Sequence, residues 1–161
     1  MRLILVRHAE AVNVGQNGVR TDFDRHLTAH GHATAQALAD RLVAMGLRAD
    51  AVVASPLVRA RQTAEPLLKL VDGMAELILC DELAPDVGKS KKVAKALNEI
   101  GVQTVVAVSH LPDVSAFANW LVGGGGLQFD KGTAALIETN GPLDKEAGWL
   151  VWLMSPECYQ R

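Results

Sequence analysis

The sequence predicts an α/β fold: a three-layer α/β/α sandwich with a mostly parallel, mixed sheet. Two observations predict it. Short apolar runs, several of them rich in β-branched residues, alternate with longer amphipathic runs along the chain. The apolar runs are continuous rather than alternating, which is typical of strands buried on both faces. At 161 residues without a linker-like segment, the chain is expected to form a single domain over residues 1–161.

The predicted elements follow from these two kinds of run. The expected strands are the short apolar runs, at residues 3–6, 51–54, 76–80, 104–108, 133–139 and 149–154. The expected helices are the amphipathic runs, at residues 28–45, 56–70, 88–99 and 112–122. The polar, glycine-containing stretch 9–26 is expected to be a long loop.

Local signals set several of these boundaries. Thr28 suits the N-cap of the first helix, and Gly46 suits its end. Ser55 and Pro56 suit the N-cap and first turn of the second helix. The last two strands are joined by a short turn around Gly141, so we expect them to be antiparallel.

Composition argues against several function classes. Apolar residues make up 49% and charged residues 21%, as in ordinary globular proteins, so disorder is not expected. A net charge of −2 argues against bulk binding to nucleic acid or to acidic membranes, and no apolar run approaches the ~18 residues of a membrane span. Cys80 and Cys158 are too few for a disulfide framework. We expect a cytoplasmic monomer with no targeting segment, no metal and no cofactor.

Charged and polar side chains follow the predicted strands at their carboxyl ends. Arg7 and His8 follow the first strand, and His110 comes just after the fourth. Arg59 lies one turn into the helix after the second strand. Ligands of open α/β sheets bind outside the carboxyl ends of the strands, so we expect these side chains to meet there. Two histidines and two arginines, with helix N-termini beside them, suit a phosphoryl group.

Each of these residues has a chemical role that fits such a ligand. The neutral imidazole of His8 can attack phosphorus and hold the phosphoryl group covalently. The planar forks of Arg7 and Arg59 can bind its oxygens, and His110 can bind them or move protons. The alternatives are a backbone-bonded histidine and surface salt bridges; the shared location of the residues favours the functional interpretation.

For three further residues the functional and the structural interpretation are equally good. Glu82, after the third strand, is a candidate general acid that protonates a leaving alkoxide, with Asp81 and Asp86 competing for the role. Arg25 and Asn13, in the long loop, are candidates for a rim that contacts the substrate. The alternative for all three is an exposed, solvated loop residue.

These residues stand in motifs that resemble those of the histidine phosphatase superfamily, which has the phosphoglycerate-mutase-like fold. The motifs occur in the family's order, as Arg7-His8-Ala9-Glu10, Leu27-Thr28-x-x-Gly31, Ser55-Pro56-x-x-Arg59-Ala60-x-Gln62-Thr63-Ala64 and Ser109-His110. Ala9 stands where the family commonly has glycine. The short chain, the sequence after His110 and the late Trp152-Leu153-Met154-Ser155-Pro156 are similar to the SixA-type phosphohistidine phosphatases.

The resemblance implies that His8 is the nucleophile, that Arg7, Arg59 and His110 complete a phosphate pocket, and that no metal takes part. It implies a phosphohistidine substrate on a phosphotransfer domain or sensor kinase of two-component signalling. Imidazole leaves more easily than an alkoxide, because its conjugate acid has a pKa of about 6.5, so such an enzyme needs less from Glu82. The alternatives are a phosphatase of small phosphomonoesters (sugar or nucleotide phosphates), a mutase, and a non-catalytic phosphate-binding module.

Overall fold

The computed structural model describes residues 1–160 and contains one six-stranded sheet, in the order β3-β2-β4-β1-β5-β6. The strands are β1 (Arg2–Arg7), β2 (Ala51–Ala54), β3 (Ile78–Leu79), β4 (Thr104–Ser109), β5 (Ala134–Thr139) and β6 (Gly148–Met154). The first four are mutually parallel, whereas β5 is antiparallel to β1 and β6 is antiparallel to β5. The predicted mixed sheet, including its late antiparallel pair, is confirmed.

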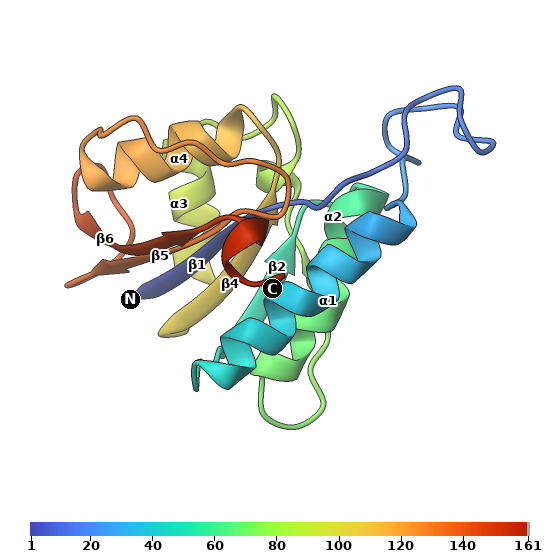
Figure 1. Ribbon diagram of the computed structural model, residues 1–161. Coiled ribbons are helices and arrows are strands. Elements are labelled where there is room, and N and C mark those ends of the chain that lie inside the picture. Colours follow the sequence, from blue (N-terminus) through green and yellow to red (C-terminus); the bar gives the residue numbers. More distant parts are fainter. Residues whose placement is uncertain (161) are drawn as a thin grey trace.

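Four α-helices cover the two faces of the sheet. They are α1 (Ala29–Ala44), α2 (Val58–Ala64), α3 (Ser90–Glu99) and α4 (Asp113–Val122). Helices α1 and α2 lie on one face, and α3 and α4 lie on the other (Figure 1). Along β1, Ile4 and Val6 pack toward α1 and α2, while Leu3 and Leu5 pack toward α3 and α4. The strand is therefore apolar at every central position because both of its faces are buried.

Three predicted boundaries are wrong. Ser55 does not cap the second helix: α2 begins at Val58 without a side-chain cap. Its α-helical part also ends early, and residues Glu65–Leu70 form a 3₁₀ helix, η1, that contains Pro66. Proline has no amide hydrogen to donate and crowds the preceding turn, which disfavours a continued α-helix. The predicted strand at 76–80 shortens to β3, whose two side chains are exposed at the edge of the sheet.

The end of the long loop after β1 is bonded to its own beginning, although its middle projects beyond α1 and α2 (Figure 1). Thr28 caps α1 as predicted, with its Oγ1 accepting from the amide of Gly31 at 3.0 Å. The amide of Thr28 donates to the carbonyl of Glu10. A Cβ on Gly31 would collide with that same carbonyl, so only glycine allows this close approach. The loop therefore returns to the chain immediately after His8.

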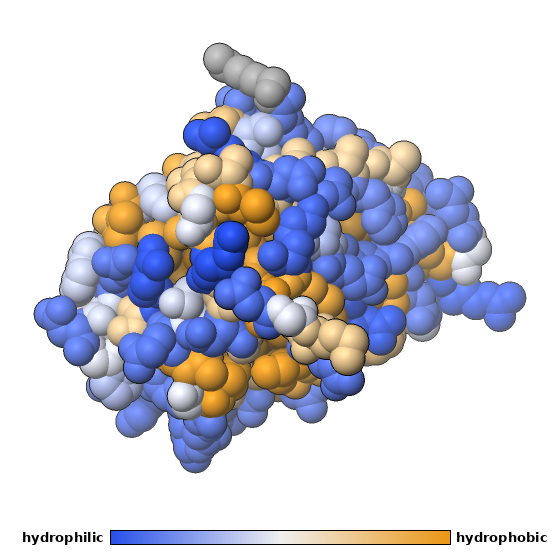
Figure 2. Space-filling model, turned by 90° about the horizontal axis from the view of Figure 1, so that it is seen from below, coloured by the Kyte–Doolittle hydropathy of each residue, from blue (hydrophilic) through white to orange (hydrophobic). Residues whose placement is uncertain are grey.

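Two short 3₁₀ helices complete the fold, η2 (Asp81–Leu83) and η3 (Pro156–Cys158). The face of the molecule in Figure 2 is largely hydrophilic, with hydrophobic residues gathered in patches between the polar ones. The edge strand β6 exposes several apolar side chains, at Trp149, Leu150, Val151 and Leu153. Among residues 1–160, no helix combines the length and the apolar character that crossing a membrane requires.

Candidate active site

His8 and His110 lie side by side at the carboxyl ends of two neighbouring strands. Strands β1 and β4 are parallel and pair Arg7 with Ser109, so the next residue of each strand is a histidine. The ring centroids are 5.0 Å apart, and the two residues are 6% and 2% exposed. The sheet register therefore creates a buried histidine pair from two segments about a hundred residues apart.

The hydrogen bonds of His8 determine which ring nitrogen carries the proton and which carries the lone pair. Its Nδ1 lies 2.7 Å from the carbonyl oxygen of Ala9, and a carbonyl only accepts, so Nδ1 carries the proton. Its Nε2 accepts a hydrogen bond from Nε of Arg59 at 3.3 Å. The lone pair of Nε2 therefore faces the arginine that can hold a phosphoryl oxygen. The backbone of Ala9 lies outside the left-handed region, so alanine makes this turn without strain.

Both histidines are neutral at physiological pH. Burial is the main cause that lowers the pKa of His8 to about 3. The positive charges of Arg59, Arg7 and Arg25 lower it further, whereas the hydrogen bond to Ala9 acts to raise it. Burial likewise brings the pKa of His110 far below its ordinary value, and the neighbouring His8 and Arg59 add to the effect. A neutral imidazole has the lone pair that nucleophilic attack requires.

His110 is held by the opposite ring nitrogen. Its Nε2 lies 2.8 Å from Oγ of Ser55, and within residues 1–160 its buried Nδ1 has no hydrogen-bond partner. Buried polar atoms without a partner are rare in native proteins, and this one lies beside His8. It is available to a ligand oxygen. Sequence reasoning assigned Ser55 to a helix cap and missed this contact.

Arg59 enters the site from α2 and is only 4% exposed. Besides its bond to His8, it donates through Nη1 to the carbonyl of Asp22 at 2.7 Å and through Nη2 to Oδ2 of Asp22 at 3.0 Å. Burial lowers the pKa of Arg59, whereas the Asp22 carboxylate opposes that shift. Thr63 joins the two halves of the site, because its Oγ1 accepts from the amide of Ala9 and donates to the carbonyl of Arg59.

Arg7 is anchored from the side of β5. Its Nη1 donates to the carbonyl of Phe129 at 2.8 Å, and it lines a cleft of about 470 Å³ with Asp130 and Ser155. Among the described residues, its buried Nε has no hydrogen-bond partner. Arg7 thus offers a second unpaired nitrogen, and this one is an obligate donor, as a phosphoryl oxygen requires.

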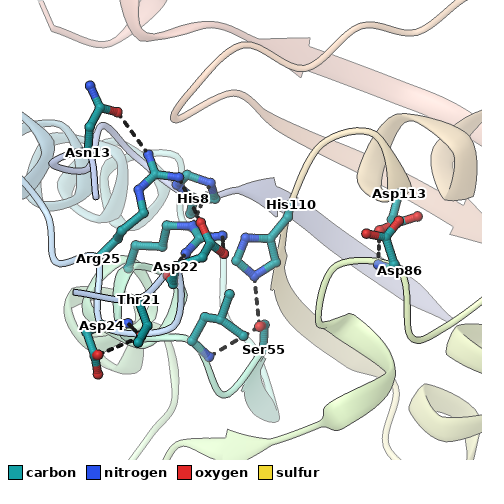
Figure 3. Close-up of polar contacts among 12 residues, drawn as sticks. His8, Asn13, Thr21, Asp22, Asp24, Arg25, Ser55, Asp86, His110 and Asp113 are labelled. Carbon is teal, nitrogen blue, oxygen red and sulfur yellow. Dashed lines mark hydrogen bonds and ion pairs between the residues drawn. The ribbon is translucent and has the colours of Figure 1, made fainter. Parts of the chain in front are cut away.

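The long loop brings Arg25, Asn13 and Asp22 to the mouth of the site (Figure 3). Arg25 donates to Asp22 Oδ1 at 3.0 Å and to the carbonyl of Val12 at 2.7 Å, and it reaches Asn13 Oδ1 at 3.5 Å. Arg25 and Asn13 are therefore near the cluster, as expected of a rim. Sequence reasoning did not single out Asp22; its position three residues before Arg25 is the local signal that it missed.

Glu82 lies elsewhere. Its carboxylate accepts a hydrogen bond from the thiol of Cys80 at 3.4 Å and lines a cleft at the β3 edge with Val53 and Ile100. No hydrogen bond joins it to His8, Arg59 or His110 within the described chain. The competitor Asp86 is also remote from the histidines, pairing through its amide with Asp113 (Figure 3). Over residues 1–160, no three His, Cys, Asp or Glu side chains are grouped so as to hold a metal ion.

Comparison with known proteins agrees with this arrangement. The family model of the histidine phosphatase superfamily (branch 1) matches residues 3–89, more than half of the chain. The structure of the protein histidine phosphatase SixA complexed with tungstate is similar over 97% of both chains, with 27% identity and a TM-score of 0.81. The structure of a putative phosphohistidine phosphatase SixA from Nakamurella multipartita is similar over 96% of this chain and 95% of that chain, with 26% identity and a TM-score of 0.80.

A curated relative matches a shorter region. The mitochondrial serine/threonine-protein phosphatase Pgam5 of Drosophila melanogaster is 39% identical over 77 residues, which are 48% of this chain and 25% of that protein. The chain therefore spans about a quarter of the length of this relative. The family match covers the residues that bring Arg7, His8 and Arg59 together. The chain therefore belongs to branch 1 of the histidine phosphatase superfamily.

Proposed function

We propose that the protein is a phosphohistidine phosphatase, which removes the phosphoryl group from a histidine of a phosphotransfer domain or sensor kinase. The observation that carries this proposal is the hydrogen bonding of His8, whose protonated Nδ1 is fixed on Ala9 while Nε2 faces Arg59. A neutral imidazole held in this tautomer is a ready nucleophile. The likeness to SixA over nearly the whole chain supports the choice of substrate.

The reaction has two steps. Nε2 of His8 attacks phosphorus in line, a new N–P bond forms, and the P–N bond of the substrate breaks as its imidazole leaves and takes up a proton from water. Arg7, Arg59 and His110 hold the phosphoryl oxygens, since phosphoryl transfer is catalysed mainly by positioning and charge. The hydroxide left by that proton transfer then attacks phospho-His8, the N–P bond breaks, orthophosphate leaves, and the neutral imidazole of His8 is restored.

The carboxylates near the site favour a good leaving group. Glu82 is bonded to Cys80 instead of the histidines. Asp22 is close, and although partial burial acts to raise the pKa of its carboxyl, hydrogen bonds from Arg25 and Arg59 outweigh this and lower it. Asp22 is therefore ionised and has no proton to give. An imidazole leaves without strong acid catalysis, because its conjugate acid has a pKa of about 6.5, whereas an alkoxide does not.

A second candidate is a phosphatase of phosphate esters, either small phosphomonoesters or phosphorylated hydroxyl side chains. The 39% identity over 77 residues with Pgam5, a serine/threonine-protein phosphatase, favours this second candidate. We further propose that the chain forms a single domain, because all six strands of the described residues belong to one sheet, and that it acts as a cytoplasmic monomer on a two-component protein.

The test is phosphate release from a histidine-phosphorylated phosphotransfer domain, measured beside p-nitrophenyl phosphate, with His8→Ala as the control. We expect His8-dependent release from the protein at a rate far above that from the small ester. Release from esters alone would select the second candidate. Phosphate binding without turnover and without a phosphoenzyme would contradict both and leave a binding module.

A further inference from the structure

The carboxylate of Asp22 bridges two guanidinium groups at the mouth of the site (Figure 3). Its Oδ2 accepts from Nη2 of Arg59 at 3.0 Å, and its Oδ1 accepts from Nη1 of Arg25 at 3.0 Å. Among residues 1–160, no other carboxylate forms an ion pair with either arginine. Asp22 therefore sets the charge that an incoming substrate meets.

Asp22 lies on the side of the site where the leaving group must be. Its side chain is 56% exposed, whereas that of Arg59, which it contacts, is 4% exposed and lies against the buried His8. In-line displacement puts the leaving group on the side of phosphorus opposite the nucleophile. Since His8 forms the buried end, the leaving group points toward solvent and toward the Asp22 carboxylate.

The same contacts occupy Arg25. Its Nη1 is on Asp22, its Nε donates to the carbonyl of Val12 at 2.7 Å, and its Nη2 faces Asn13. A free arginine at this mouth would attract a carboxylate on the substrate. With Asp22 ionised and bonded to both Arg25 and Arg59, the positive charge of Arg25 is partly offset. Asp22 therefore offsets one of the two guanidinium charges, and the entrance is less positive than Arg25 and Arg59 alone would make it.

We propose that Asp22 selects substrates by the charge of the leaving group. It disfavours phosphate compounds whose leaving group carries a carboxylate, and it favours those that release a neutral or protonated nitrogen base. This inference rests on the proposed function, in which the leaving group is an imidazole that departs with a proton. Asp22 thereby influences which substrates bind through the charge of its carboxylate, and it does not donate a proton.

The test uses three phosphonates of matched size, which bind as phosphate mimics but have a C–P bond that is not hydrolysed. They are ethylphosphonate, 2-aminoethylphosphonate and phosphonoacetate, with neutral, cationic and anionic tails. Dissociation constants are measured by calorimetry for the wild type and for Asp22→Asn, which keeps the shape and removes the charge. We expect the Asp22 charge to weaken the binding of phosphonoacetate relative to that of 2-aminoethylphosphonate in the wild type. In Asp22→Asn we expect phosphonoacetate to gain about tenfold in affinity relative to 2-aminoethylphosphonate. A factor of this size corresponds to one charge interaction in a partly exposed site.

Asp24→Asn is the matched control. Asp24 lies on the same loop, and its carboxylate accepts a hydrogen bond from the hydroxyl of Thr21 at 2.6 Å, its one side-chain partner among residues 1–160. We expect this variant to keep the wild-type ratio. An equal shift in Asp24→Asn, or a loss in Asp22→Asn that is the same for all three ligands, would overturn the proposal, because either result assigns Asp22 no selective role. If the wild type binds none of the phosphonates, the phosphate site and the proposed function fail together.

Discussion

His8 and His110 occupy equivalent places at the ends of two neighbouring strands, yet they present opposite ring nitrogens to the pocket. His8 is held through Nδ1 by the carbonyl of the next residue, Ala9, which leaves Nε2 toward Arg59. His110 is held through Nε2 by Ser55, which leaves Nδ1 without a partner in residues 1–160. Both rings are buried and neutral, so burial alone does not distinguish them.

The difference lies in what fixes each ring. The ring of His8 is oriented by a hydrogen bond to the backbone of the next residue, Ala9. Its other nitrogen, Nε2, accepts a hydrogen bond from the positively charged Arg59. His110 is bonded to a serine hydroxyl from another strand end, and a hydroxyl can donate or accept. His110 can therefore change tautomer as charge develops on the phosphoryl oxygens, whereas His8 keeps its lone pair. This contrast fits one nucleophile and one stabilising partner.

Replacing His8, the proposed nucleophile, should have the largest effect. In His8→Ala we expect turnover to fall on the order of 10⁴-fold or more, because no other side chain replaces the attacking nitrogen. Rapid acid-free quenching with labelled substrate should show a phosphoenzyme in the wild type and none in the variant. A circular dichroism spectrum like that of the wild type serves as the control for folding. Turnover near the wild-type rate would remove His8 from the mechanism.

Replacing the second histidine should cost less. In His110→Asn we expect kcat to fall on the order of 10²–10³-fold, since one stabilising contact to the phosphoryl oxygens is lost. The phosphoenzyme should still form, but slowly, and this separates the two histidines in single-turnover measurements. If His110→Asn abolishes the phosphoenzyme as completely as His8→Ala does, the assignment of different roles is wrong.

The two histidines should behave alike in stability. The pKa of His8 is about 3 in the folded protein and near 6.5 in the unfolded chain, so between these values only the unfolded chain takes up the proton. Stability is therefore complete above about pH 6.5 and falls by about 1.4 kcal/mol per pH unit below it for this one group. His110, whose pKa is also lowered, adds a second contribution of the same sign.

Urea unfolding of the wild type and of His8→Asn between about pH 4 and 6 measures this contribution. The slope of the free energy of unfolding against pH should be shallower in the variant by about 1.4 kcal/mol per unit. An unchanged slope would mean that His8 is protonated in the folded protein, and its neutral nucleophilic state would then need another explanation.

Removing the charge of Glu82, whose carboxylate accepts a hydrogen bond from Cys80, should have the smallest effect. In Glu82→Gln we expect turnover of a phosphohistidine substrate to stay within about twofold of the wild type, because the side chain contacts the Cys80 thiol and no histidine of the pair. Asp81→Asn is the neighbouring control. A large loss with a phosphate ester but not with phosphohistidine would show that Glu82 moves into the site when the leaving group needs a proton.

Much of the fold followed from local pattern. The continuous apolar runs placed β1, β2 and β4, and the capping residue Thr28 placed the start of α1. The errors occurred where a local signal competed with tertiary contacts. Ser55 and Pro56 read as a helix start, but the Ser55 hydroxyl faces His110. The run around β3 read as a full strand, yet only two of its residues pair, at the edge of the sheet.

The sequence by itself determined the buried strands, the helices between them, and which residues stand at the strand ends. These features depend on neighbours along the chain, through periodicity, caps and turns. Only the tertiary structure decided that His110 turns Nε2 to Ser55, and that Asp22 reaches Arg59 as well as Arg25. The orientation of a side chain among partners distant in sequence is set by three-dimensional packing and hydrogen-bond satisfaction, and no local pattern records it.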